Sequence, residues 1–296
     1  MKLTSKLLLA VPSLLLSSTL YAAPIILNNA ESTINFSTLQ SHGGSSVGYN
    51  PVNDQYYVTG IGTSSYGGQV FDASGTSVGS TQPVGVDVRS VYYDYNSGTM
   101  NTLSYNAKSG TSSGRDGVYQ MGLDGNGVFT GSNTRVMTQL SGLFNAQSVA
   151  AYDSIRDRFY SYGGGNVLVT DSITGALDFT VALESVSGFS LQSNSIAYAS
   201  EYELLIGLDF SLDQAIIWDL GGALLGTSQL ADLNYNDRYG LGYANGQLFV
   251  ADSGRTNYYG FNIFEGTSEP IPAPAPLILI SISMVAMGFS RKRKTS

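Results

Sequence analysis

The 296-residue chain has no cysteine, one histidine, one tryptophan and only 12% charged residues. The absence of cysteine excludes disulfides, thiolate nucleophiles and cysteine-ligated zinc. Because His42 is the only histidine, zinc sites built from several histidines are excluded as well. The low charge does not indicate disorder, because 43% of the residues are apolar and can build a core.

The few charges are unevenly distributed. Six of the 14 basic residues lie at the two ends of the chain, whereas all 22 acidic residues fall between Glu31 and Glu269, so the middle carries a net charge of −14. A body this acidic repels phosphates, which argues against nucleic-acid binding. Cations and positively charged partners suit it better.

The N-terminus has the three parts of a secretory signal peptide, assigned to residues 1–23. Lys2 and Lys6 precede an apolar stretch over residues 7–20, and small residues follow at Ala22 and Ala23. Pro24 hinders cleavage just before it, so the bond after Ala22 is the expected site. An uncleaved anchor is the alternative, but the apolar stretch is short for a membrane span of ~20 residues.

The C-terminus also has three parts. Residues 267–276 form a proline-rich spacer, which predicts a stiff, extended segment. Residues 277–296 form an apolar stretch followed by a basic block, which predicts a transmembrane helix whose basic end stays cytoplasmic.

This order of parts resembles the PEP-CTERM sorting signal. The residues that carry the resemblance are Pro272, Ala273, Pro274, Arg291, Lys292, Arg293 and Lys294. Alanine stands where the motif usually has glutamate between its prolines. The resemblance implies processing by an exosortase-type membrane enzyme of a Gram-negative bacterium, often one that makes exopolysaccharide. The body is then expected in the periplasm on an inner-membrane anchor, with later release to the cell surface or matrix. An ordinary C-terminal anchor is the alternative, and it also places the body outside the inner membrane.

The middle, residues 24–266, repeats one unit of short strands. Its first strand recurs with an apolar second position at Val47, Val91, Val149, Ile196 and Leu241, in steps of 44, 58, 47 and 45 residues. A later strand recurs with an Asp–Gly turn that begins at Asp72, Asp124, Asp171 and Asp219. In such turns the Asp side chain caps the turn and the glycine takes positive φ.

Four short strands per ~45 residues are typical of a β-propeller blade. We therefore expect an all-β fold with five four-stranded blades. Six or seven remain alternatives, because the 58-residue step has room for extra structure. Residues 33–39 precede the first unit, and we expect them to pair into the last blade and close the ring. A β-sandwich fits the strand density but not the period. The repeat is similar to bacterial extracellular propellers of the YVTN or NHL kind.

Catalytic motifs are weak in this sequence. Residues 110–114 match the G-x-S-x-G elbow, but they lie in a Gly/Ser loop rather than between a strand and a helix. We expect a flexible loop there and a solvated His42. Aspartates recur near strand ends, at Asp87, Asp94, Asp153, Asp157, Asp209 and Asp252. A ring of them around the channel would bind a divalent ion, as in propeller lactonases, although turn capping is the simpler role.

No cofactor is predicted except calcium as a candidate. Its possible ligands alternate at Asp232, Asn234, Asn236 and Asp237, like the start of a calcium loop. The glycine and the final acid of such a loop are missing, so turn capping is the alternative.

Tyrosine is frequent, with 20 residues, and several occur as adjacent pairs on expected strands. Adjacent residues of a strand point to opposite faces, so we expect one ring of each pair in the core and the other exposed. Tyr57, Tyr93 and Tyr259 are the candidate exposed rings for stacking on sugars or on a protein partner. Trp218 lies in an apolar strand and is expected in the core.

Three functions are consistent with these features. The first is a non-enzymatic surface or matrix propeller that binds exopolysaccharide or a protein. The second is a metal-dependent hydrolase or lactonase that uses carboxylates at the channel, and the third is a structural matrix component without a specific ligand.

Overall fold

The computed structural model describes residues 24–26, 29–30, 32–35, 43–62, 67–108, 116–191, 194–230, 240–252 and 257–265. The signal peptide, the spacer, the sorting tail, the calcium candidates, His42 and residues 110–114 all lie outside these described residues. No helix long and apolar enough to cross a membrane occurs in the part of the chain that the structure describes.

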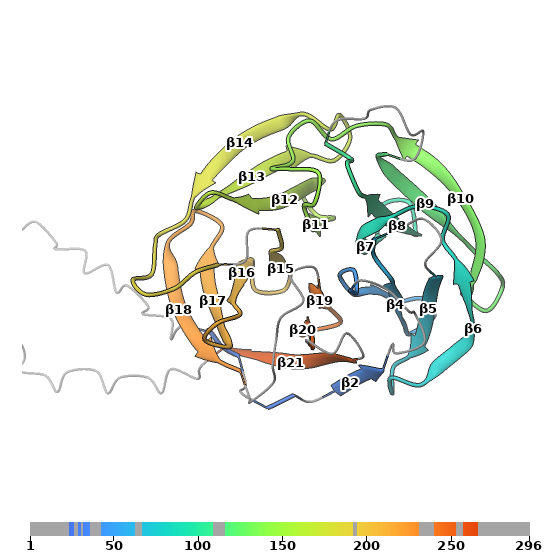
Figure 1. Cartoon of the computed structure of the whole chain (residues 1–296), viewed down its shortest axis with the longest axis horizontal. Helices are drawn as coiled ribbons and strands as arrows, with labels where there is room; N and C mark the ends of the chain where they lie inside the picture. The colour runs from blue at the N-terminus through green and yellow to red at the C-terminus, as the bar shows by residue number, and fades with distance from the viewer. Residues whose placement is uncertain are drawn as a thin grey trace, which may run out of the picture. The chain divides into compact units, whose positions relative to one another are not determined.

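Ala23–Glu265 form one compact unit, built as a propeller of five antiparallel blades (Figure 1). Blade 1 comprises β3 (Gly48–Asn50), β4 (Gln55–Thr59), β5 (Gly67–Asp72) and β6 (Ser77–Pro83). Blade 2 comprises β7 (Val88–Asp94), β8 (Thr99–Ser104), β9 (Val118–Leu123) and β10 (Phe129–Met137). Blade 3 comprises β11 (Ala151–Asp153), β12 (Arg158–Gly163), β13 (Asn166–Asp171) and β14 (Leu177–Ala182). Blade 4 comprises β15 (Ala197–Ala199), β16 (Leu204–Asp209), β17 (Gln214–Asp219) and β18 (Leu224–Gln229).

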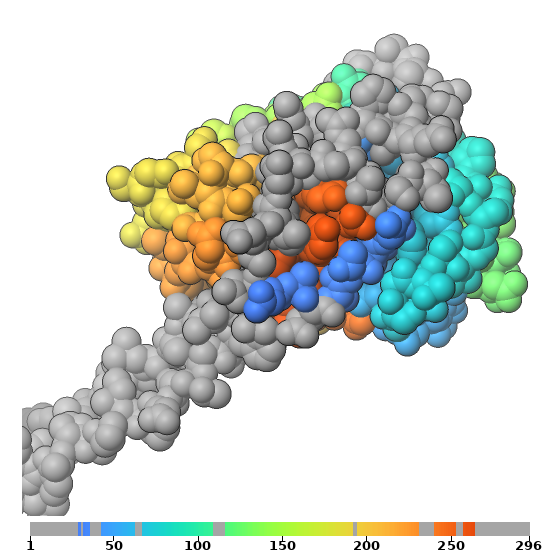
Figure 2. Space-filling view, turned by 60° about the horizontal axis from the view of Figure 1, so that its bottom comes forward, coloured from blue at the N-terminus to red at the C-terminus, as the bar shows by residue number. Residues whose placement is uncertain are grey.

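Blade 5 takes strands from both ends of the unit. It contains β19 (Leu241–Ala244), β20 (Gln247–Ala251) and β21 (Asn257–Glu265), and its outer edge is formed by β1 (Pro24–Ile26) and β2 (Ser32–Asn35). The predicted closing strand is therefore confirmed over the described residues 33–35, which pair with residues 257–259 of β21. In Figure 2 the N-terminal residues, in blue, lie along the orange-red residues of blade 5 and beside the cyan residues of blade 1.

The innermost strands β3, β7, β11, β15 and β19 contact one another around the whole ring. This arrangement confirms the propeller of five blades, and the β-sandwich alternative is wrong. The long step in the repeat holds no extra blade. Its additional residues lengthen β10 and form a connection whose Leu140 and Leu143 are buried between blades 2 and 3.

The outer turns of the blades follow the predicted Asp–Gly pattern. Asp124 Oδ1 accepts hydrogen bonds from the backbone N–H groups of Asn126 and Val128, each at 2.9 Å. Gly127 in the same turn has φ of 79°, a conformation that favours glycine. The Asp72, Asp171 and Asp219 turns are capped in the same way.

The hydrophobic core is divided among the five interfaces between neighbouring blades. Each blade is packed on both faces, so strands β4, β16 and β17 are buried nearly throughout. The expectation of one buried and one exposed ring per tyrosine pair is therefore wrong for Tyr56 and Tyr57. Tyr56 packs toward blade 5 and Tyr57 toward blade 2. Trp218 is buried between blades 3 and 4, as predicted.

Candidate binding site at the mouth of the central channel

A cavity of about 340 Å³ opens on the ring axis, where the five innermost strands turn into their second strands. We call this cavity the mouth. Seven tyrosines line it, and Glu201 is the one charged residue among its described lining residues. The mouth is thus mainly a surface of phenol rings, hydroxyl groups and small apolar side chains.

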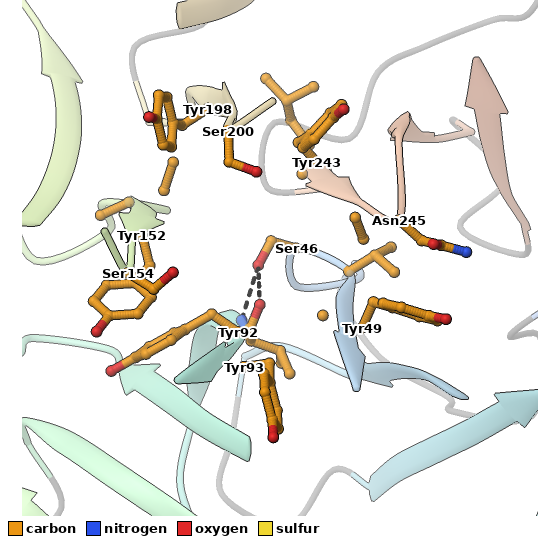
Figure 3. Close-up of a pocket in the computed structure, with 18 of the residues that line it drawn as sticks. Ser46, Tyr49, Tyr92, Tyr93, Tyr152, Ser154, Tyr198, Ser200, Tyr243 and Asn245 are labelled. Atoms are coloured by element: carbon orange, nitrogen blue, oxygen red, sulfur yellow. Dashed lines mark hydrogen bonds between the residues drawn. The ribbon is translucent and has the colours of Figure 1, made fainter. Parts of the chain in front are cut away.

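Five of the seven tyrosines occupy one equivalent position in each of the five blades. They stand at the same place near the end of each innermost strand: Tyr49, Tyr93, Tyr152, Tyr198 and Tyr243. Each packs against a different one of the five inter-blade cores. In Figure 3 their rings point outward from the open centre.

Small residues keep the centre of the mouth open. The residue before the tyrosine is Gly48, Ala151, Ala197 or Gly242 in four blades. At Gly48 a Cβ atom would come within 2.8 Å of Val91 in the neighbouring innermost strand, so that close approach requires glycine. Blade 2 differs, because Tyr92 occupies the equivalent position.

The tyrosine hydroxyls at the rim of the mouth contact charged partners. Tyr49 donates a hydrogen bond of 2.6 Å to Asp54 Oδ1. The hydroxyl of Tyr198 accepts one of 3.0 Å from Arg156 Nη1. Arg156 also forms ion pairs with Asp153, at 3.0 Å, and with Glu203. This guanidinium is therefore engaged by two carboxylates at the interface of blades 3 and 4.

These surroundings raise the pKa of four of the five tyrosines. Burial, followed by the Asp54 carboxylate, raises the pKa of Tyr49 to about 12. Burial and the Asp153 carboxylate raise the pKa of Tyr198 to about 12 as well. Burial is also the main cause that raises the pKa of Tyr152 and of Tyr243. At neutral pH these phenols can form hydrogen bonds and stack, but they do not act as bases.

A groove of about 380 Å³ lies between blades 2 and 3 and shares Tyr92 and Tyr152 with the mouth. The centroids of these two rings are 4.4 Å apart. Asp94, Asn96, Asn101, Asp157 and Ser172 supply its polar lining, and Val136 and Ile173 supply exposed apolar side chains. The mouth and the groove are therefore neighbouring cavities that share these two aromatic side chains.

The predicted binding tyrosines have different positions. Tyr93 lines the mouth and packs at 4.9 Å from the ring of Tyr95, which is 62% exposed. Tyr57 is fully buried, and its hydroxyl lies 2.8 Å from the carbonyl oxygen of Gly127, so it belongs to the core. Tyr259 is half-buried against the core between blades 4 and 5. Glycan or protein binding by any of these residues stays a prediction.

The recurring aspartates do not converge on the channel. Asp94, Asp153 and Asp157 lie at the first hairpins of blades 2 and 3, whereas Asp87, Asp209 and Asp252 lie at the opposite ends of the strands. Several cap turns, as Asp209 does for Ser211 at 2.8 Å, and Asp87 pairs with Arg89. No group of three or more histidine and carboxylate side chains able to hold a metal occurs in the described ranges.

The five mouth tyrosines carry a signal in the sequence. Each copy of the first strand has a tyrosine two or three residues after its apolar second position. This regularity predicts the number of blades. In a closed ring it also requires the five tyrosines to meet at one end.

No family model matches the chain, and no curated protein matches its sequence. Among solved structures, the fold is similar to that of glutaminyl cyclase from Myxococcus xanthus, with a TM-score of 0.52 and 10% identity over 82% of this chain and 98% of that chain. It is also similar to a gluconolactonase from Xanthomonas campestris, with a TM-score of 0.47 and 8% identity over 80% of this chain and 99% of that chain. The likeness to the cyclase supports the β-propeller fold alone.

Proposed function

We propose that this chain is a non-enzymatic propeller of the cell surface or extracellular matrix, and that it binds a glycan at the mouth. The observation that supports this proposal is the ring of five tyrosines, one from each blade, around an open cavity. Sugars present C–H faces that pack on aromatic rings and hydroxyl groups that bond to polar side chains. Serine, asparagine and tyrosine side chains of the mouth supply such polar groups.

The raised pKa values of the tyrosines also favour binding over catalysis. General acid–base catalysis works best with a group whose pKa lies near the working pH. Tyr49 and Tyr198, with pKa values of about 12, are far from that condition. A neutral ring that donates and accepts hydrogen bonds suits reversible recognition instead.

The two ends of the chain carry the proposed targeting signals. The leader and the PEP-CTERM-like tail would export the body, anchor it at the inner membrane and present it to an exosortase-type enzyme. Deleting Arg291, Lys292, Arg293 and Lys294 should then change membrane retention of the full chain. Unchanged retention in fractionated cells would refute the role given to the basic block.

Glycan-array screening followed by calorimetric titration tests the binding site. Tyr93→Ala should weaken the affinity for an array-selected glycan by about two- to tenfold, because it removes a ring and its stacking energy. Tyr105→Ala is the matched control, since Tyr105 is 40% exposed and lies beyond β8, at the opposite end of the strands. A blank array, or equal effects of the two substitutions, would contradict glycan binding at the mouth.

A further inference from the structure

The groove between blades 2 and 3 sets this side of the mouth apart. Elsewhere the position before the mouth tyrosine is glycine or alanine, but here it is Tyr92, which packs against Tyr152 and Phe159 of blade 3. Both Tyr92 and Tyr152 line the mouth and the groove. The mouth and the groove therefore meet at two aromatic side chains of this interface.

Two carboxylates face the same hydroxyl in this groove. The Tyr152 hydroxyl lies 3.4 Å from Asp94 Oδ1 and 3.4 Å from Asp157 Oδ1. A phenol has one proton and can satisfy only one of these oxygens at a time. Asn96 Nδ2 donates a further hydrogen bond of 2.7 Å to Asp157. The two carboxylates are thus held in place by neutral groups.

No lysine or arginine lines the described part of the groove. The nearby Arg156 is directed to Asp153 and Glu203, and Arg158 pairs with Asp178. The charge of Asp94 and Asp157 is therefore left for a ligand to balance. Complementary charge favours a positively charged ligand in this groove and disfavours an anionic polymer.

We propose that the groove and the mouth together bind a linear glycan that carries free amino groups, with one protonated amine between Asp94 and Asp157. This inference rests on the proposed glycan-binding function and specifies its ligand class. A sugar chain fits the lining better than a basic peptide does, because the tyrosine, asparagine and serine side chains of both cavities match ring faces and hydroxyls. The protonated amine supplies the positive charge that the lining of the groove lacks.

The test uses two probes that differ only in acetylation: short β-1,4-linked glucosamine oligomers and their N-acetylated counterparts. Titration calorimetry is done with the full chain in mildly acidic buffer, where amines are protonated and carboxylates stay ionised. The free-amine oligomer should bind about tenfold more tightly, because its bonds to the carboxylates are charge-assisted.

The double variant Asp94→Asn, Asp157→Asn removes both charges and keeps the side-chain shape. Asparagine also tolerates the positive φ of 51° at position 157. This variant should reduce the preference for the free amine to about twofold or less, chiefly by weakening the binding of the free-amine oligomer. Asp72→Asn is the control, because Asp72 also caps a turn, the one between β5 and β6 of blade 1, but does not line the groove.

The outcomes separate the two proposals. If both oligomers bind equally, or the double variant keeps the preference, the amine assignment is overturned while glycan binding stands. If a neutral glycan binds through Tyr93 and neither oligomer binds, the assignment is likewise overturned. Tighter binding of oligolysine than of the free-amine oligomer would assign the groove to a basic peptide instead. Absence of binding to every glycan would refute the proposed function itself.

Discussion

Replacing Ile34 with alanine should destabilise the whole propeller, although Ile34 lies on a strand of only four residues. Its side chain is 1% exposed and packs in the core between blades 5 and 1. Truncation of a buried isoleucine to alanine costs about 2–5 kcal/mol, because transfer energy is lost and a cavity remains. The nearly complete burial among the aromatic side chains of Tyr56, Phe249 and Tyr258 places the expected loss at roughly 3–4 kcal/mol.

The single tryptophan allows this loss to be measured far from the substitution. Trp218 is buried between blades 3 and 4, so its fluorescence reports on a part of the ring that Ile34 does not contact. Urea unfolding is followed by Trp218 fluorescence and, in parallel, by far-ultraviolet circular dichroism. If the ring unfolds as one unit, both signals should shift to the same lower midpoint with an unchanged slope. Ile155→Ala is the control, because Ile155 is 74% exposed and its truncation should change stability by less than ~0.5 kcal/mol.

Two results would refute this reasoning. A loss below about 1 kcal/mol would mean that the closing strand does not bury Ile34 as the structure has it. A shifted circular dichroism signal with an unmoved Trp218 midpoint would mean that the blades unfold independently. Cooperative unfolding of the whole ring would then be refuted, although the structure of each blade would stand.

Three further outcomes follow from residues described above. Tyr57→Phe should lower the free energy of unfolding in urea by about 1–2 kcal/mol, because the buried hydroxyl that donates to the Gly127 carbonyl is lost. The substitution should leave glycan affinity unchanged. Weaker glycan binding with intact stability would place Tyr57 at the surface. Gly127→Ala should lower the free energy of unfolding by about 1–3 kcal/mol, because the φ of Gly127 is 79°. Gly125→Ala should change it little, because an added Cβ meets nothing within 4 Å there. Equal effects of the two substitutions would contradict the turn geometry. From neutral pH to pH ~9, Tyr49 and Tyr198 should leave thermal stability unchanged, and stability should fall as the pH rises from ~10, where unfolded tyrosine is half ionised, through about 12, because the raised pKa values of these two tyrosines let the folded state keep protons that the unfolded state loses. Tyrosinate absorbance that develops fully near pH ~10 would contradict the burial assigned to these rings.

The ring and its closure could be predicted because both depend on local sequence patterns. The first strand of each blade recurs at a nearly constant step, and the Asp–Gly turns combine a capping side chain with a residue that accepts positive φ. Thr33 and Ile34 stood out because they form a strand before the first repeat with no partner inside it. The five copies of the first strand predicted five blades, and the structure shows that the long step is a connection rather than a further blade.

The site could be predicted only in part, because exposure depends on how blades pack. Alternation along a strand places Tyr56 and Tyr57 on opposite faces, but it does not reveal that neighbouring blades cover both faces. Tyr93 was identified as a binding candidate and lines the mouth, whereas its four counterparts were not singled out. The groove is lined by side chains from both blade 2 and blade 3. The repeat pattern of a single strand does not show which side chains of two blades will meet.

The pairing of β1 and β2 with β21 determines when in folding the ring can close. During synthesis, residues 24–35 are made long before their partners at residues 257–265. The earlier partner must therefore wait, with the apolar side chain of Ile34 uncovered, until the last strand of blade 5 has been made. This large separation in sequence makes closure of the ring a late event in folding.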